Sequence, residues 1–225
     1  MDRAREQHAA YVAVLEDCGL EVVTLPAIDE LPDAVFVEDP VHVLDEVAVA
    51  LSPGAPSRVP EVAPLANAIS VYRPVVWIEP PATIDGGDIL RIGRTLFVGR
   101  SGRTNEAGIQ AFARIAGERG YDVRAVAMRD CLHLKSGCTS IGERVLINPA
   151  WVDLDAFREY DPLPVPSSEH AAADVLQLPG VVVMPDTFPK TTVRLRDLGF
   201  EVRTVDVSEF RKAEAGVTCL SVLIR

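Results

Sequence analysis

Hydrophobic and polar positions along the chain repeat one local pattern three times. A helix-like stretch ends at a glycine, and a β-branched alternation that begins with Glu or Asp follows it. The three copies are GLEVVTLP at 19–26, GYDVRAVAM at 120–128 and GFEVRTVDV at 199–207. Glycine suits the left-handed residue that often follows a helix, and the alternation is typical of a strand. The pattern therefore predicts a chain built from repeated helix–strand units.

A second, unusual strand is predicted after a short loop that follows each copy. These strands are DAVFVED, LHLKSGC and GVTCLSV. Two further candidates are VVWIEPPATIDGGDIL at 75–90 and DVLQLPGVVVMP at 174–185. Together they indicate about five βαβ-like units without a long linker, and hence one domain over residues 1–225.

Helices are expected at the polar and amphipathic stretches between these strands. Their approximate ranges are 2–17, 61–70, 104–118, 151–160 and 187–198. The third is expected to open with Thr104 as its cap and Glu106 in its first turn. Continuous apolar runs such as VVVM and SVLI are typical of strands covered on both faces, which predicts an α/β fold with helices outside and strand edges inside.

Composition narrows the class of protein. With 48% hydrophobic residues among 225, the chain is expected to be ordered and globular. The formal net charge of -11 argues against a nucleic-acid partner, because phosphate binding needs clustered Lys and Arg. The first residues read as a charged helix rather than a secretion signal, and no apolar run is long enough to span a bilayer. We therefore expect a cytoplasmic protein with no membrane partner.

Two residues are candidates for a nucleophile and its proton carrier. Cys219, in AGVTCLSVLIR, has Gly216, Thr218 and Ser221 around it, and a reactive thiolate needs such a polar environment. His133, in DCLHLKSGC, has the pKa range that a cysteine nucleophile requires of its proton carrier. A small buried cysteine and a hydrogen-bonded core histidine are the purely structural alternatives.

Two other patterns admit both a structural and a functional interpretation. The four cysteines form no CxxC pair, which favours a reducing compartment, but Cys131, His133 and Cys138 together make a partial zinc-ligand set without a fourth ligand of matched spacing. The motif DGGD, which runs from Asp85 to Asp88, is either a tight turn or a place where a ligand or another backbone approaches closely. A carboxylate there could orient the histidine.

Charged residues next to apolar ones suggest a binding pocket. Three carboxylates, Asp33, Glu38 and Asp39, flank the apolar stretch in PDAVFVEDP, and a buried carboxylate is costly unless a cation or a hydrogen bond meets it. Arg58 in SPGAPSR and Arg103 in GRSGRTN lie in loops, either as solvated charges or as guanidinium groups that bind a carboxylate. Together the two sets predict a pocket for a zwitterion with an added positive charge.

These stretches together resemble the dimethylarginine dimethylaminohydrolases, members of the guanidine-modifying superfamily that also includes arginine deiminases and amidinotransferases. The matching segments, in order along the chain, are LPDAVFVEDP, PGAPSR, ATIDGGDIL, FVGRSGRTN, LHLKS and GVTCLSVLI. The resemblance implies the family's five-bladed α/β propeller, the pentein fold, with ββαβ units around a pseudo-fivefold axis that carries the active site. Because the chain starts directly at a helix, the first blade is expected to lack its initial strand and the loop that covers the substrate.

The resemblance also implies roles for the candidate residues. It implies Cys219 as nucleophile, His133 as general acid and base, and Asp85 as the carboxylate that orients the histidine. The implied binders of the substrate's guanidinium and amine are Asp33, Glu38 and Asp39, and those of its α-carboxylate and of the site's loops are Arg58 and Arg103. The implied reaction converts N-omega-methylated arginine to citrulline and methylamine or dimethylamine through a covalent thiouronium, with no cofactor or metal.

One position bears on the choice of substrate. Arginine deiminases and amidinotransferases typically place Asp two residues after the histidine, whereas this chain has Lys135, which favours methylated arginines over arginine. A hydrolase or deiminase of another guanidino compound and a non-catalytic guanidino-binding protein are the alternatives. A homodimer is compatible with each of these.

Overall fold

The computed structural model describes residues 2–224 and contains four three-stranded sheets of one design. In each sheet an antiparallel hairpin is followed by a helical segment and by a third strand that pairs in parallel with the second. The strands are β1 (Val41–Val43), β2 (Ala48–Ala50), β3 (Val75–Trp77), β4 (Ile89–Ile92), β5 (Thr95–Arg100), β6 (Asp122–Ala127), β7 (Cys138–Ile141), β8 (Arg144–Ile147), β9 (Pro162–Pro164), β10 (Leu176–Leu178), β11 (Val181–Pro185) and β12 (Glu201–Val205).

Between the second and third strand of each sheet lies a helical segment, which contains α2, α3, η3 or α5. The α-helices are α1 (Asp2–Asp17), α2 (Val59–Ile69), α3 (Glu106–Gly117), α4 (Leu134–Gly137), α5 (Pro189–Asp197) and α6 (Ser208–Arg211). The 3-10 helices are η1 (Pro56–Arg58), η2 (Gly86–Asp88), η3 (Leu154–Tyr160) and η4 (Thr218–Leu220). In the part of the chain that the structure describes, no helix is both long and apolar enough to cross a bilayer.

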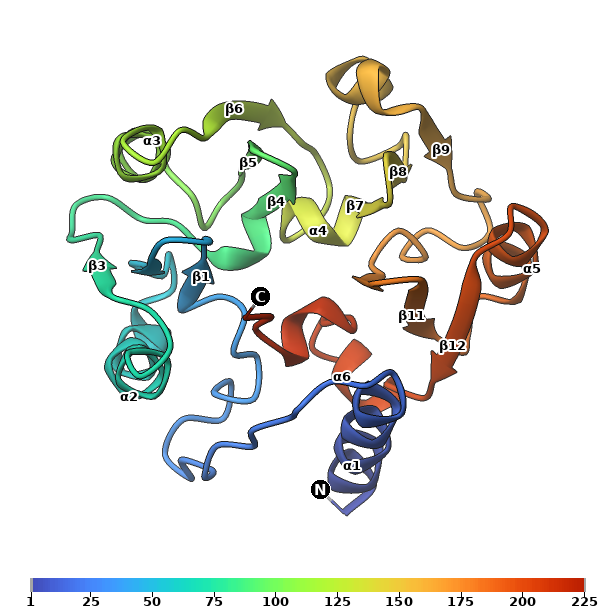
Figure 1. The fold of residues 1–225 in the computed structure, drawn as a ribbon, viewed down its shortest axis with the longest axis horizontal. Helices are drawn as coiled ribbons and strands as arrows, with labels where there is room; N and C mark the ends of the chain where they lie inside the picture. The colour runs from blue at the N-terminus through green and yellow to red at the C-terminus, as the bar shows by residue number, and fades with distance from the viewer. Residues whose placement is uncertain (1, 225) are drawn as a thin grey trace.

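The sheets are arranged in a ring, as Figure 1 shows. Helices α2, α3 and α5 lie on its outside, whereas strands β1, β4 and β7 face its middle. This confirms the predicted α/β fold with helices outside. A further sector, which contains α1 and α6, lies between the first and the last sheet, and within residues 2–224 it contains no strand.

Most predicted helices are confirmed. Those near 2–17, 61–70, 104–118 and 187–198 are α1, α2, α3 and α5, while the one near 151–160 is the 3-10 helix η3. The predicted cap of α3 is wrong. The Asn105 side chain accepts from the Gly108 N–H (2.8 Å) and caps the helix, because the Thr104 hydroxyl instead donates to Asp88 (2.6 Å).

Three predicted strands that carry candidate site residues are wrong, whereas the 75–90 segment with Asp85 does contain β3 and the start of β4. DAVFVED forms successive turns, LHLKSGC contains the short helix α4, and GVTCLSV contains η4. GLEVVTLP is not a strand either, although Gly19, Gly120 and Gly199 all have positive φ as predicted. Alternation alone suggested strands. In the site segments, however, backbone N–H groups donate to side-chain carboxylates instead of to the carbonyl oxygens of a neighbouring strand. Leu134 N, for example, donates to the Asp88 carboxylate (2.9 Å).

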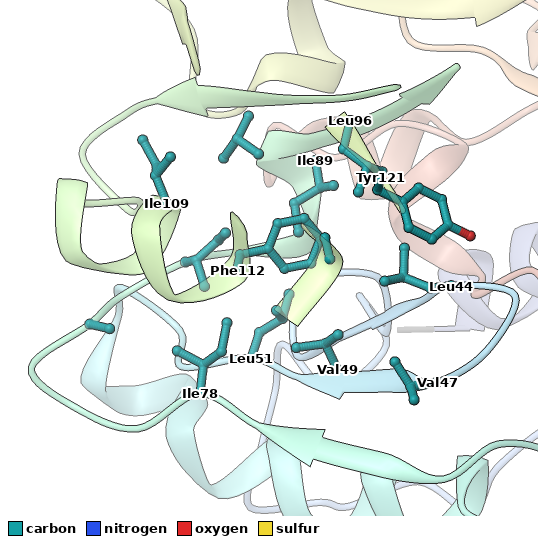
Figure 2. Close-up of a cluster of buried hydrophobic side chains, with 14 residues drawn as sticks. Leu44, Val47, Val49, Leu51, Ile78, Ile89, Leu96, Ile109, Phe112 and Tyr121 are labelled. Atoms are coloured by element: carbon teal, nitrogen blue, oxygen red, sulfur yellow. The ribbon is translucent and has the colours of Figure 1, made fainter. Parts of the chain in front are cut away.

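The largest apolar cluster joins two neighbouring sheets (Figure 2). Val49 belongs to β2, whereas Ile89 and Leu96 belong to β4 and β5, and Phe112 of α3 is fully buried among them. Full burial of one such side chain contributes roughly 1.5–3 kcal/mol. The shared core therefore fixes the loop before β4, which carries DGGD, relative to the first sheet.

Candidate active site

His133 and Asp85 meet in the interior although they lie in loops that lead into different sheets. Asp85 directly precedes η2 and His133 directly precedes α4, and His133 Nε2 lies 3.0 Å from Asp85 Oδ2. The other Asp85 oxygen accepts from Gly54 N (2.8 Å), so the carboxylate is held from both sides. Burial alone would lower the pKa of His133, but the Asp85 hydrogen bond and the nearby charges of Asp39 and Asp88 outweigh it and raise the pKa to about 9. At neutral pH the imidazole is thus charged and can donate a proton.

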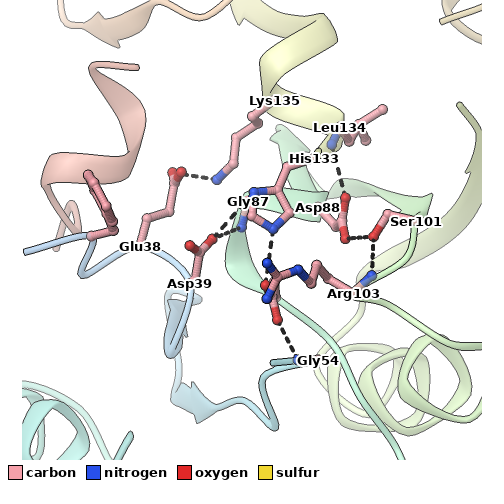
Figure 3. A network of polar contacts seen from close by, with 12 residues as sticks. Glu38, Asp39, Gly54, Gly87, Asp88, Ser101, Arg103, His133, Leu134 and Lys135 are labelled. Carbon is pink, nitrogen blue, oxygen red and sulfur yellow. Dashed lines mark hydrogen bonds and ion pairs between the residues drawn. The ribbon is translucent and has the colours of Figure 1, made fainter. Parts of the chain in front are cut away.

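Gly87 explains why the DGGD motif contains glycines. Its N–H donates to Asp39 Oδ1 (2.9 Å), and this oxygen lies 3.9 Å from His133 Nδ1 (Figure 3). A Cβ on Gly87 would lie 2.7 Å from the imidazole ring and 2.8 Å from the Asp39 carboxylate, so no side chain fits there. The motif is therefore both a turn and a close backbone approach between two functional groups.

Asp88 is a site residue to which the sequence analysis assigned no role. One oxygen accepts from Leu134 N (2.9 Å), and the other accepts from the hydroxyls of Ser101 (2.5 Å) and Thr104 (2.6 Å). These bonds fix the backbone that follows His133 (Figure 3). The available sequence indication was the pair of hydroxyl residues in the SGRTN loop, which a buried carboxylate needs as donors.

The two arginines differ in their surroundings. Arg58 is buried and forms ion pairs with Asp39 and Glu61, and it also donates to the carbonyl oxygens of Phe36 (2.8 Å) and Asp33 (3.2 Å). Its guanidinium thus binds the loop that carries the carboxylates.

Arg103 has a half-buried side chain that makes no hydrogen bond or ion pair with any other residue between 2 and 224. Asp33, which is also half-buried, takes part in the described hydrogen bonds through its carbonyl oxygen only. Both charged groups remain available to a ligand.

Glu38 already has a cation as its partner. Lys135 of α4 donates from Nζ to Glu38 Oε1, and the two side chains point toward one another in Figure 3. The second carboxylate oxygen, Oε2, is buried without a hydrogen-bond partner among the described residues. Burial raises the pKa of Glu38, and the charge of Lys135 opposes this rise. A ligand N–H could satisfy the free oxygen while Lys135 holds the other.

Cys219 lies in η4 and is 8% exposed. Its carbonyl oxygen accepts from Glu38 N (3.4 Å). This bond joins the Cys219 segment, residues 216–221, to the carboxylate loop, residues 33–39, which carries Asp33, Glu38 and Asp39. The Tyr11 hydroxyl of α1 donates to Val217 O (2.9 Å) and lies 2.8 Å from Ser221 Oγ, so it holds the backbone on both sides of the cysteine.

The charges around Cys219 disfavour its thiolate. Burial, then the charges of Asp174, Glu38 and Asp39, raise its pKa well above that of a free thiol. Without a cationic ligand the group is therefore a thiol at neutral pH. A positive charge bound beside these carboxylates would favour the thiolate.

The partial zinc-ligand set, weighed in the sequence analysis as an alternative, is not brought together. Cys138 is fully buried in an apolar cluster, and the ligand atoms of Cys131, His133 and Cys138 are not gathered around a common point in residues 2–224. Instead Asp39, Asp85 and His133 each place one ligand atom within 4.8 Å of the others. The two carboxylates of this group can attract a cation, but the imidazole, charged at neutral pH, has no lone pair to offer a metal ion.

Comparison with known proteins finds related enzymes over nearly the whole chain, although no protein-family model matches it. It is 41% identical over 224 residues to the N(G),N(G)-dimethylarginine dimethylaminohydrolase of Streptomyces coelicolor, an alignment that covers 99% of this chain and 86% of the relative. With the corresponding Pseudomonas aeruginosa enzyme it is 34% identical over 223 residues, covering 98% and 88%.

Solved structures give the same result. A cysteine-to-serine variant of the Pseudomonas aeruginosa enzyme in complex with citrulline matches with a TM-score of 0.94 and 32% identity, and the match covers 98% of this chain and 88% of the other. The N-terminal domain of a cyanobacterial arginine dihydrolase matches with a TM-score of 0.87 at 22% identity, covering 97% and 85%, and so shares the fold.

Proposed function

Since the chain belongs to the dimethylarginine dimethylaminohydrolase family and is a hydrolase acting on C–N bonds, we propose that it converts N-omega-methylated arginine to citrulline. The other product would be dimethylamine or monomethylamine. The observation that carries this proposal is the buried group of Asp39, Asp85 and His133, an arrangement suited to a cation, which is joined through Glu38 to the Cys219 segment.

The substrate would be held by opposite charges at its two ends. The guanidinium would bind Asp39 and the free oxygen of Glu38, and the α-amine would bind Asp33. The α-carboxylate would bind Arg103, whose guanidinium is unengaged within residues 2–224. We assign Arg58 to the loops of the site, because its donors already serve protein groups.

The chemistry follows from the charges around the two reacting residues. A bound guanidinium beside Asp39 and Glu38 would lower the pKa of Cys219, so that the thiol releases its proton to solvent and the resulting thiolate attacks the guanidinium carbon. His133, protonated at neutral pH, would give its proton to the departing methylated amine, which leaves a covalent S-alkylthiouronium. The neutral imidazole would then take a proton from water, whose oxygen bonds to the same carbon and displaces the sulfur. These steps use protein groups and water and require no cofactor.

Lys135 would bias the enzyme toward methylated substrates. Its ammonium group occupies one oxygen of Glu38, so that carboxylate has fewer acceptors for guanidinium N–H groups. A methylated nitrogen has fewer N–H groups or none, so a methylated substrate would lose fewer hydrogen bonds here than arginine would.

The four sheets and the sector of α1 support a five-bladed pentein propeller. Each sheet would be one ββαβ blade, and the sector of α1 and α6, in which residues 2–224 form no strand, would be the fifth. Residues 1–225 would then form one catalytic domain, which acts in the cytoplasm on a small molecule.

The decisive experiment measures citrulline formation by the purified protein with asymmetric dimethylarginine and with arginine side by side. The Cys219→Ser variant is the blank, and we expect turnover of the methylated substrate only. Binding is followed by calorimetry, and Asp39→Ala should lose binding whereas Cys219→Ser keeps it. Substrate binding without citrulline formation by the unaltered protein would refute the catalytic proposal and favour a guanidino-binding protein.

A further inference from the structure

Asp174 is a buried carboxylate that the reaction described above does not use. It lies two residues before β10 and is 5% exposed, yet it forms no ion pair with a described residue. Its Oδ1 accepts a hydrogen bond from the backbone N–H of Thr218 (3.3 Å), the residue directly before Cys219. A buried charge without a cation is costly, so its position requires a reason.

The same carboxylate determines the shape of the turn that leads to Cys219. A Cβ built on Gly216 would lie 2.1 Å from Asp174 Oδ2, so the carboxylate occupies the space of a side chain at this position. On the other side, the Tyr11 hydroxyl donates to Val217 O (2.9 Å). The turn is thus held between a carboxylate and a phenol.

We propose that Asp174 is a positioning residue for the nucleophile: it fixes the turn that carries Cys219, and its negative charge adds to the effect of burial in keeping this cysteine a thiol until a cationic substrate binds. The inference rests on the proposed role of Cys219 as nucleophile. It adds a group that holds the resting enzyme unreactive and makes its reactivity depend on the charge of the ligand.

The charges that face Asp174 support this role. Glu38 and Lys135 act on it from the carboxylate loop and from α4, and it acts in turn on Tyr11 of α1 and on Cys219. Burial, with the charge of Glu38, raises the pKa of Asp174 to about 7. Among the charged groups that raise the pKa of Cys219, Asp174 has the largest effect.

Asp174 can exchange its proton with solvent. It lines a cavity of about 210 Å³ that also borders Cys131, in the loop before His133, and Ser136 of α4. The other titratable groups on this cavity are Asp130, Cys131, Arg211 and Glu214. As pH rises through about 7, Asp174 would release its proton into this cavity and oppose ionisation of Cys219. A bound guanidinium would offset that negative charge.

The test separates the charge of Asp174 from its hydrogen bond. Asp174→Asn has nearly the same shape and keeps an oxygen for Thr218 N, whereas Asp174→Ala loses both. Glu169→Gln is the matched control, because Glu169 is equally buried but binds Thr191 (2.6 Å to its hydroxyl) at the start of α5, away from the site. Alkylation of Cys219 by iodoacetamide is followed by peptide mass spectrometry between about pH 6 and 12, without substrate, in the full chain.

In Asp174→Asn we expect the midpoint of Cys219 alkylation to fall by about one pH unit, with roughly tenfold faster alkylation near pH 8. Glu169→Gln should follow the unaltered protein. An unchanged midpoint in Asp174→Asn would overturn the electrostatic role.

In Asp174→Ala, kcat for citrulline formation should fall roughly tenfold or more with little change in KM, while Asp174→Asn retains most of the kcat of the unaltered protein.

Equal kcat values in Asp174→Asn, Asp174→Ala and Glu169→Gln would overturn the positioning role. If Asp174→Ala does not fold, the alkylation midpoint of Asp174→Asn alone decides the test. Alkylation requires no turnover. A shifted midpoint in a protein that forms no citrulline would therefore refute the proposed function and leave the role of Asp174 intact.

Discussion

Replacing Arg58 tests whether this arginine supports the site loop or binds the substrate. Its guanidinium binds Asp39 and Glu61, whose side chains are 4% and 3% exposed, and donates to two carbonyl oxygens of the 33–36 segment. Arg58→Ala would leave two buried carboxylates without their cation. Breaking a buried ion pair by removing one partner typically costs about 3–5 kcal/mol.

Such a loss is large for one domain. In a chain of this length each kcal/mol corresponds to about 2–4 °C, so the midpoint of thermal unfolding should fall by roughly 6–20 °C. Arg58→Lys keeps the charge but cannot bond to both carboxylates and both carbonyls, so it should recover only part of the loss.

Arg103→Ala is the matched control. Its side chain has no described hydrogen bond or ion pair, so the free energy of unfolding should change by no more than about 0.5 kcal/mol, while KM for the methylated substrate should rise roughly tenfold or more. Urea unfolding and steady-state citrulline assays measure both quantities. If Arg58→Lys unfolds like the unaltered protein and only its KM rises, Arg58 binds the substrate and the reasoning is refuted.

Three further perturbations test the site and the helix cap. Because folding raises the pKa of His133 from 6.5 to about 9, the stability that it contributes is fully present below about pH 6.5 and is lost as pH rises through about 9, up to roughly 3 kcal/mol. Urea unfolding at about pH 6 and 9.5 should reveal this loss, and Asp85→Asn should remove most of it; the same loss in both proteins would contradict the assignment. Gly87→Ala should lower kcat roughly hundredfold with the fold retained by circular dichroism, since its Cβ would displace the imidazole ring, and an unaltered kcat would count against the close approach. Asn105→Ala should cost about 1 kcal/mol in urea unfolding and leave kcat unchanged, whereas Thr104→Val should lower kcat; the reverse result would restore Thr104 as the cap.

The local elements could largely be predicted from the sequence. Helices α1, α3 and α5 lie before the three glycines that indicated their ends, and α2 lies at the polar stretch predicted near 61–70, because such signals depend on neighbouring residues only. The glycine at position 19 has the expected positive φ, but the alternating residues after it form no strand. A strand requires a partner, and sequence periodicity does not show whether one lies beside it.

The site segments show the same limit more clearly. LHLKSGC alternates like a strand, yet Leu134 N bonds to the Asp88 carboxylate, 46 positions away in the chain, and the segment turns into α4. A short apolar alternation is compatible with either outcome. The Asp88 carboxylate decides between the two outcomes, because a buried carboxylate requires hydrogen-bond donors.

By itself the sequence determined the family and the helical periodicity, and it is the source of the proposal that Cys219, His133 and Asp85 supply the chemistry of the site. Only the tertiary structure decided the partners: His133 meets Asp85 across 48 positions, Lys135 meets Glu38 across 97, and Arg58 faces inward. Periodicity arises from backbone sterics between near neighbours. Pairing depends on which charges are buried together once the sheets have packed into a ring, because each buried carboxylate must then find a donor within reach.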